Sequence, residues 1–113
     1  MTNLWFYRAT IGQPQRDLTG FDVEATDGSI GSVDENTTDR DHLVVDTGFW
    51  IFGKRRLLPA GVVDRIDYDD EKVYVNLTKD QVKDAPDLDE SLDRSFAEWN
   101  RAPYQEYYHP YGW

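Results

Sequence analysis

Hydrophobic and polar residues alternate along much of the chain. In the first such stretch Phe21, Val23 and Ala25 are separated by polar side chains, which is typical of a β-strand with one buried face. An Asp-Gly pair follows directly, and this dipeptide favours a tight turn between antiparallel strands. The pattern therefore predicts a β-hairpin over residues 21–33, with Gly31 at a bulge or a sharp bend.

Four more strand-like runs follow this hairpin, at residues 42–46, 55–59, 62–69 and 72–78. The connections between them are too short for the helical crossovers that parallel strands need. We therefore expect a mainly β fold, a small six-stranded antiparallel β-barrel, because closure of a sheet removes its exposed edges.

The hydrophobic period changes to a helical one after the last strand. Thr78 is placed to cap a short helix over residues 79–84, which Pro86 would end. A second helix is predicted over residues 87–103, where acidic residues crowd the start, Pro103 closes the run, and three apolar side chains fall at helical spacing: Leu92, Phe96 and Trp99.

The final residues show no clear period. The expected organisation is thus an N-terminal arm (residues 1–19), one barrel domain (20–90) and a C-terminal helix with an aromatic tail (91–113).

The charge of the chain limits its partners. It has 22 acidic and 12 basic residues, a formal net charge of −10. Proteins that bind DNA electrostatically typically neutralise about 6–10 phosphates, whereas the one dense cationic cluster here is Lys54-Arg55-Arg56. We therefore predict no direct nucleic-acid binding, and expect partners that are basic or that dock through apolar surface.

Membrane insertion is not expected, because no run approaches the roughly 20 apolar residues of a membrane helix. The first residues lack the basic start and apolar core of a signal peptide, so the sequence predicts a cytoplasmic protein. The absence of cysteine excludes disulfides and thiolate chemistry.

No catalytic constellation is found. The serines lack the sequence context of an activated nucleophile. His42 opens a strand and is interpreted as a capping or surface histidine rather than a general base, and His109 as a packed or solvated ring in the tail. We therefore predict no enzyme.

Two acidic runs, at residues 34–41 and 67–71, are the candidate metal sites of the chain. Neither has the ligand order or the central glycine of a calcium loop, so they are interpreted as solvated turns. Weak calcium binding stays open, and no metal or cofactor is predicted.

Aromatic residues gather at both ends of the chain, where they form the main candidate interaction surface: Trp5, Phe6, Trp99, Tyr104, Tyr107, Tyr108, Tyr111 and Trp113. Soluble monomers rarely expose large apolar patches, so these rings should pack on their own barrel or on a partner. Self-association is the favoured alternative, since one small barrel offers little room for so many rings, and Tyr and Trp are enriched at interfaces.

The run DTGFWIFGKRRLLP is a second candidate surface, formed by Phe49, Trp50, Phe52, Lys54, Arg55 and Arg56. Its aromatic residues are expected to fold over an open end of the barrel. Its cations would either guard an edge strand against unwanted pairing or contact carboxylates of the same chain. A partner site here is the weaker alternative.

The order of these motifs resembles the PRC-barrel domain. The matching elements are the Asp27-Gly28 turn with Gly31, the Leu57-Leu58-Pro59 segment and the closing LTKDQVKDAP, within residues 20–90. The ending YYHPYGW is similar to a tyrosine-rich tail of stand-alone bacterial members. This domain is known from the cytoplasmic part of the photosynthetic reaction-centre H subunit and from the C-terminal half of a ribosome maturation factor. The resemblance implies a small six-stranded barrel that docks to other macromolecules rather than catalysis.

The resulting prediction is a non-enzymatic protein–protein interaction or adaptor module that forms a homodimer through its aromatic ends. One alternative is an accessory of ribosome assembly or RNA processing that docks on a basic ribosomal protein. Another is a peripheral subunit of a membrane-bound electron-transfer complex, held there by a heterologous protein partner.

Overall fold

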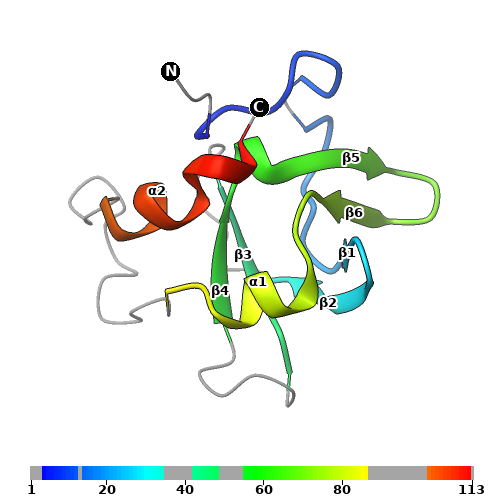
Figure 1. Ribbon diagram of the computed structural model, residues 1–113. Coiled ribbons are helices and arrows are strands. Elements are labelled where there is room, and N and C mark those ends of the chain that lie inside the picture. Colours follow the sequence, from blue (N-terminus) through cyan, green and yellow to red (C-terminus); the bar gives the residue numbers. More distant parts are fainter. Residues whose placement is uncertain (1–3, 13, 35–41, 49–54, 87–101, 113) are drawn as a thin grey trace.

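A computed structural model describes residues 4–12, 14–34, 42–48, 55–86 and 102–112 of the chain (Figure 1). Six strands form a single sheet in the order β4-β3-β2-β1-β6-β5. Their bounds confirm the predicted strands: β1 (Asp22–Ala25), β2 (Gly28–Val33), β3 (His42–Asp46), β4 (Arg55–Pro59), β5 (Val63–Asp67) and β6 (Lys72–Val75).

The sheet is mixed, which corrects the expectation of a wholly antiparallel one. Four neighbouring pairs are antiparallel, whereas β1 and β6 run parallel. The prediction treated each strand as the partner of its neighbour in sequence. Instead a short 3₁₀ helix, η1 (Ala60–Val62), carries the chain from β4 at one edge to β5 at the other, and β6 then returns beside β1.

The connection through η1 requires the sheet to curl. Six strands laid flat would hold the two edge strands about 24 Å apart, whereas the four Cα–Cα steps from Pro59 to Val63 reach at most about 14 Å. The edges β4 and β5 must therefore approach each other at the η1 end. Figure 1 shows the resulting half-barrel, with β3 and β4 steeply inclined to β5 and β6.

Gly31 is needed for close approach between β2 and β3. The register of β1 against β2 shifts between Val23 and Glu24, which leaves Ile30 as an additional residue on β2. Gly31 has φ 147°, and a Cβ added there would lie 2.0 Å from the carbonyl oxygen of Asp46. The predicted bulge is thus confirmed, and only glycine fits there.

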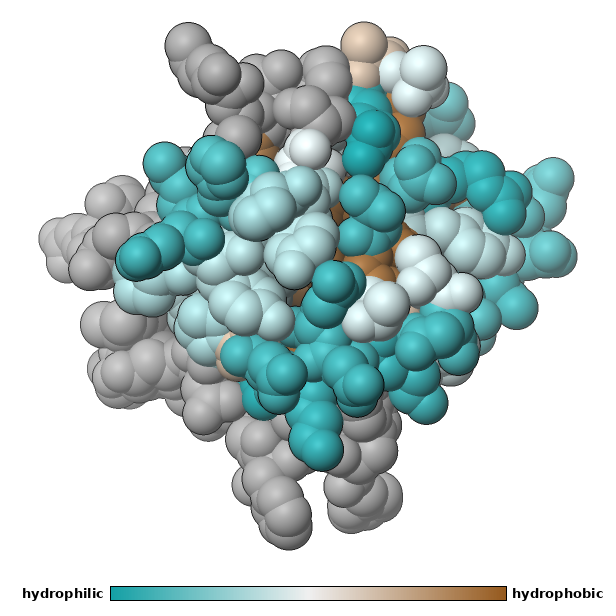
Figure 2. All heavy atoms as spheres, in the orientation of Figure 1, coloured by the Kyte–Doolittle hydropathy of each residue, from teal (hydrophilic) through white to brown (hydrophobic). Residues whose placement is uncertain are grey.

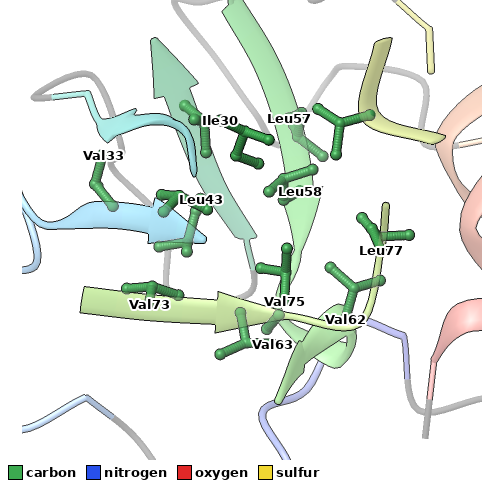
Figure 3. Packing of buried hydrophobic residues seen from close by; sticks show 14 of the residues in the cluster. Ile30, Val33, Leu43, Leu57, Leu58, Val62, Val63, Val73, Val75 and Leu77 are labelled. Carbon is green, nitrogen blue, oxygen red and sulfur yellow. The ribbon is translucent and has the colours of Figure 1, made fainter. Parts of the chain in front are cut away.

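The hydrophobic core fills the inside of the curl. In Figure 3 side chains from β2, β3, β4 and β6 point towards one another, and η1 adds Val62. Leu4, Tyr7 and Leu18 belong to the same buried cluster, so the N-terminal segment (residues 4–12 and 14–20) is packed on the barrel. His42 is buried as well, so its interpretation as a capping or surface residue was wrong. The cause is that β3 is covered on both faces, with four of its five residues buried.

Two short α-helices and a 3₁₀ turn complete the described chain: α1 (Lys79–Lys83), α2 (Ala102–Tyr108) and η3 (His109–Tyr111). The predicted cap of α1 is confirmed, because the Gln81 N–H donates to the Thr78 hydroxyl (3.2 Å) and the Thr78 N–H to the Gln81 side chain (2.8 Å). The predicted helix over residues 87–103 lies, apart from its last two residues, outside the described residues. No helix among the described residues is long and apolar enough to cross a membrane.

Candidate functional site

The candidate interaction rings that the structure describes come together at one end of the barrel. They belong to the N-terminal segment and to α2 with η3, which lie side by side in Figure 1. We call this group the terminal aromatic layer; it consists of Trp5, Phe6, Tyr104, Tyr107, Tyr108 and Tyr111. The other two predicted rings, Trp99 and Trp113, lie outside the described residues.

The N-terminal segment is held between η1 and α2. The Gly61 N–H donates to the carbonyl oxygen of Leu4 (2.6 Å), and the indole N–H of Trp5 donates to the side-chain oxygen of Gln105 on α2 (3.2 Å). Gly112 also lies against Leu4, since a Cβ added there would be 3.3 Å from the Leu4 side chain. The two ends of the described chain are therefore parts of one packed layer.

The tyrosines of α2 and η3 form a single helical stripe. Tyr104, Tyr107, Tyr108 and Tyr111 are spaced by three, four and seven residues, so they share one face of a helix. Tyr104 and Tyr108 are buried in the core, whereas Tyr107 and Tyr111 are half-buried. The Tyr107 and Tyr108 rings meet edge to face, with centroids 5.1 Å apart.

Gln81 joins this stripe to α1. The Tyr107 hydroxyl donates to the backbone oxygen of Gln81 (2.6 Å), and the Gln81 side-chain N–H donates to the Tyr111 hydroxyl (3.3 Å). Because the same Gln81 side chain accepts the Thr78 N–H in the helix cap, the cap and the tail form one hydrogen-bonded unit. Burial raises the pKa of Tyr107, and the neighbouring Tyr111 and Asp84 raise it further, so its hydroxyl keeps the proton that it donates.

Arg56 lies beneath the tyrosine stripe rather than on the surface. Its side chain is only 3% exposed, and its guanidinium donates to the carbonyl oxygens of Val82 and Lys83 (both 3.2 Å) at the end of α1. A cation is favourable there because the last carbonyls of a helix carry partial negative charge. The alternative in which Arg56 guards the sheet edge as an exposed cation is therefore wrong.

Tyr108 is fully buried next to Arg56. Burial is the main cause that raises the pKa of Tyr108, and the nearby Arg56 charge only partly opposes it. Among the described residues its hydroxyl has no hydrogen-bond partner. Tyr108 thus contributes ring packing to the core while carrying an unsatisfied polar atom.

Arg55 contacts a carboxylate of its own chain, which is the second of the two alternatives predicted for these cations. Its guanidinium lies 3.2 Å from the carboxylate of Asp34, which is itself mostly buried. Neither arginine therefore forms an open cationic surface. The remaining members of the second candidate surface, Phe49, Trp50, Phe52 and Lys54, lie outside the described residues.

Phe6 is the exposed part of the terminal aromatic layer. Its side chain is 65% exposed, and among the described residues no other large hydrophobic side chain is exposed to this degree. Figure 2 shows that the visible face is mostly hydrophilic, with hydrophobic atoms in a hollow near its middle. The layer therefore buries or half-buries its other rings and leaves Phe6 exposed.

The described residues do not form a metal centre, since no group of three or more His, Cys, Asp or Glu side chains converges among them. Ser29 and Ser32 line an open hollow of about 350 Å³ beside Asp22 and Asp46.

Neither a scan against protein-family models nor a search of curated proteins finds a match to this chain.

Proposed function

We propose that this chain is a non-enzymatic protein-interaction module of the PRC-barrel type, which associates with a second copy of itself through Phe6 and the half-buried rings of the terminal aromatic layer. The observation that carries the proposal is the 65% exposure of Phe6, an aromatic side chain with no polar group. Aromatic side chains near the centre of an interface commonly supply most of its binding energy.

The other rings of the terminal aromatic layer favour binding because they are already ordered. Trp5 is fixed to Gln105, and Tyr107 and Tyr111 are fixed to Gln81. Side chains that are held before association lose little conformational entropy when a partner arrives. A rigid aromatic surface of this kind is suited to docking, and its small size predicts a weak, reversible complex.

A symmetric dimer would bury Phe6 twice, because each copy presents the same surface. Full burial of one phenylalanine contributes roughly 1.5–3 kcal/mol, so two contribute about 3–6 kcal/mol. A micromolar dimer needs about 8 kcal/mol. The rest must come from Trp5, Tyr107 and Tyr111, so we expect dissociation in the micromolar range or weaker.

The net charge distinguishes this dimer from a complex with a basic protein. Two copies that each carry −10 repel each other, and added salt screens that repulsion. A dimer through Phe6 should therefore tighten as salt rises. Docking on a basic ribosomal protein should weaken under the same change, because there the charges attract.

The test is the solution mass of the full chain over a concentration series by analytical ultracentrifugation. Wild type should shift from monomer to dimer, more readily at 0.5 M than at 0.05 M salt, and Phe6→Ser should remain monomeric. Tyr74→Ser, which removes a partly exposed ring elsewhere on the barrel, is the matched control and should behave as wild type. A wild-type chain that stays monomeric at several hundred micromolar, or a Phe6→Ser chain that dimerises equally well, would refute the proposal.

A further inference from the structure

Among the residues that the structure describes, strand β5 forms one edge of the sheet, and β6 is its only strand neighbour. The main-chain N–H and C=O groups on the outer side of such a strand are able to pair with another chain. The register of β5 against β6 identifies the residues of β5 that present these groups.

The register assigns Ile66 to the outer side of β5. Residues along a strand face one neighbour and the other in alternation. On β6 the odd-numbered positions face β1, because the carbonyl oxygen of Leu77 accepts the N–H of Thr26 (2.8 Å), whereas the N–H of Asn76 donates to Val62 (2.8 Å) on the β5 side. Ile66 pairs with Val73, an odd-numbered position. The N–H and C=O of Ile66 therefore point away from β6.

The N-terminal segment covers both ends of this outer edge and leaves its middle open. Arg8 donates to the carbonyl oxygen of Val63 (3.2 Å), and Arg16 donates to the carbonyl oxygen of Tyr68 (3.0 Å). Within the part of the chain that the structure describes, no hydrogen bond joins the N-terminal segment to the main chain of Ile66. The two arginines thus act as clamps on either side of an open position.

A groove lies between the open position and the N-terminal segment. It has a volume of about 380 Å³ and is lined by Thr10, Ile11 and Gln15 on one side and by β5 residues including Asp64 and Ile66 on the other. This volume lies within the range of about 300–1,000 Å³ that is usual for binding pockets. Both isoleucines are half-buried against the core, so they offer the groove an apolar contact.

We propose that this groove binds an extended, basic peptide segment of a partner protein, which adds to the sheet by pairing its main chain with Ile66. Strand addition of this kind draws affinity from main-chain hydrogen bonds and specificity from alternate side chains. An apolar side chain of the peptide would contact Ile11 and Ile66. A basic side chain would meet the carboxylate of Asp64, which is 64% exposed.

Charge favours a basic occupant over a neutral or acidic one. The cations near the groove already have partners: Arg8 lies 3.9 Å from Asp64, Arg16 contacts Glu71 at 3.0 Å, and Arg65 stacks on the Tyr74 ring at 4.1 Å. The turn that follows β5 adds exposed Asp69 and Asp70, and the whole chain carries −10. A cationic peptide is therefore attracted, and an acidic one is repelled.

This inference does not depend on the terminal aromatic layer, because the groove is formed by β5 and contains none of the layer's rings. The experiment uses the ¹⁵N-labelled full chain and a panel of acetylated pentapeptides of the form Xaa-Lys-Xaa-Arg-Xaa, with Val, Ile, Leu or Tyr at Xaa, so that the central apolar side chain lies on the same face as Ile66. At least one peptide should shift the Ile66 amide signal and slow its hydrogen exchange at least tenfold. The same peptide N-methylated at its central residue should bind at least tenfold more weakly, because it cannot complete the main-chain pair.

Two variants and one control sharpen the result. Ile66→Pro removes the outward N–H without removing a bond to β6, and should abolish binding. Asp64→Asn should weaken it severalfold, and Phe6→Ser should leave it unchanged. If Ile66→Pro does not fold, the N-methylated peptide still decides the question.

Four outcomes would overturn the inference. The first is that no peptide of the panel affects Ile66. The second is that N-methylation leaves the affinity unchanged. The third is that the acidic peptide Val-Glu-Val-Glu-Val binds as well as the basic peptides. The fourth is that Ile66 becomes protected with rising protein concentration and no peptide, which would identify a second copy of the chain as the occupant.

Discussion

The two edges of the sheet, β4 and β5, are protected in different ways. On β4 four of five residues are buried, Arg56 caps α1 from beneath, and α2 packs against the strand. On β5 only Val63 is fully buried, and two arginines of the N-terminal segment bond to the ends of the outer edge. Burial covers most residues of the first edge, whereas point contacts leave the middle of the second able to pair.

This difference implies a division of roles. Side chains along β4 should control the stability of the fold, because removing them opens the core. Side chains along β5 should control what the open edge can bind, with smaller effects on stability. Substitutions on the two sides test this division.

The largest expected effect is at Tyr108, which anchors α2 near β4. Tyr108→Ala removes a fully buried ring and should lower the free energy of unfolding by about 3–5 kcal/mol. Tyr108→Phe is the matched control: because the hydroxyl has no partner among the described residues, its loss should be neutral or stabilising by up to about 1 kcal/mol. Urea denaturation followed by circular dichroism measures both. A costly Tyr108→Phe would show that the hydroxyl is bonded after all.

Arg56 should give the next largest effect. Arg56→Met keeps most of the side-chain volume but removes the guanidinium that donates to the carbonyl oxygens of Val82 and Lys83. Val82 keeps the N–H of Ala85 (3.2 Å), so the loss should cost about 2–3 kcal/mol, mostly through Lys83 and the emptied buried position. Arg55→Met is the control on the neighbouring residue. Its guanidinium is 28% exposed where it pairs with the mostly buried Asp34, so the loss should be smaller, about 1–2 kcal/mol. Equal losses for the two variants would contradict the assignment of Arg56 to the core.

Alkaline pH should also act through the β4 side. Burial raises the pKa of Tyr108 above its usual value, so the folded chain holds the proton while the unfolded chain releases it near pH 10. This contribution is complete below pH 10 and is lost as pH rises above it, by about 1.4 kcal/mol per pH unit. Stability measured from pH 8 to 11.5 should fall less steeply in Tyr108→Phe. Identical slopes would mean that other groups cause the loss.

The smallest expected effect is on the β5 side. Arg16→Ala removes a bond to Tyr68 and cation–π contacts with the Phe21 and Tyr68 rings, and should cost about 1 kcal/mol. Arg16→Lys should recover part of the loss. The amide exchange of Tyr68 and its neighbours should accelerate while the core amides stay protected. A loss as large as that of Tyr108→Ala would remove the distinction between the two edges.

Much of the fold could be predicted from the sequence, because most strands bury one face and so show a clear period of two. Three local features were also predictable, because each depends on residues close in sequence: the hairpin at residues 21–33, the bulge at Gly31 and the cap at Thr78. The parallel pairing of β1 with β6 was not, because it is set by how η1 carries the chain between the edges.

Helix α2 was missed although the sequence contains a signal for it. The sequence pattern predicts that Pro103 ends a helix, but Pro103 is the second residue of α2, where its missing N–H costs nothing. A helical spacing links four tyrosines: Tyr104, Tyr107, Tyr108 and Tyr111. This spacing indicates α2 if Pro103 is placed in the first turn of the helix.

The candidate site was predictable in composition but not in arrangement. The sequence predicts that rings at both ends form an interaction surface, which stays a prediction. It could not assign Phe6 to solvent and Tyr108 to the core. The burial of Arg56 depends on α1 carbonyl oxygens more than 20 residues away, and the open position at Ile66 depends on the register of β5. Local patterns carry no information on either contact.

The bond between Trp5 and Gln105 spans 100 residues, and this has a consequence for folding in the cell. At about 5–20 residues per second, the ribosome produces α2 roughly 5–20 s after the N-terminal segment has been made. During that interval the partners of Trp5 and Leu4 on α2 and the tail do not yet exist. The nascent chain therefore keeps aromatic surface exposed until synthesis reaches α2, and chaperones that recognise such surface have several seconds in which to bind it.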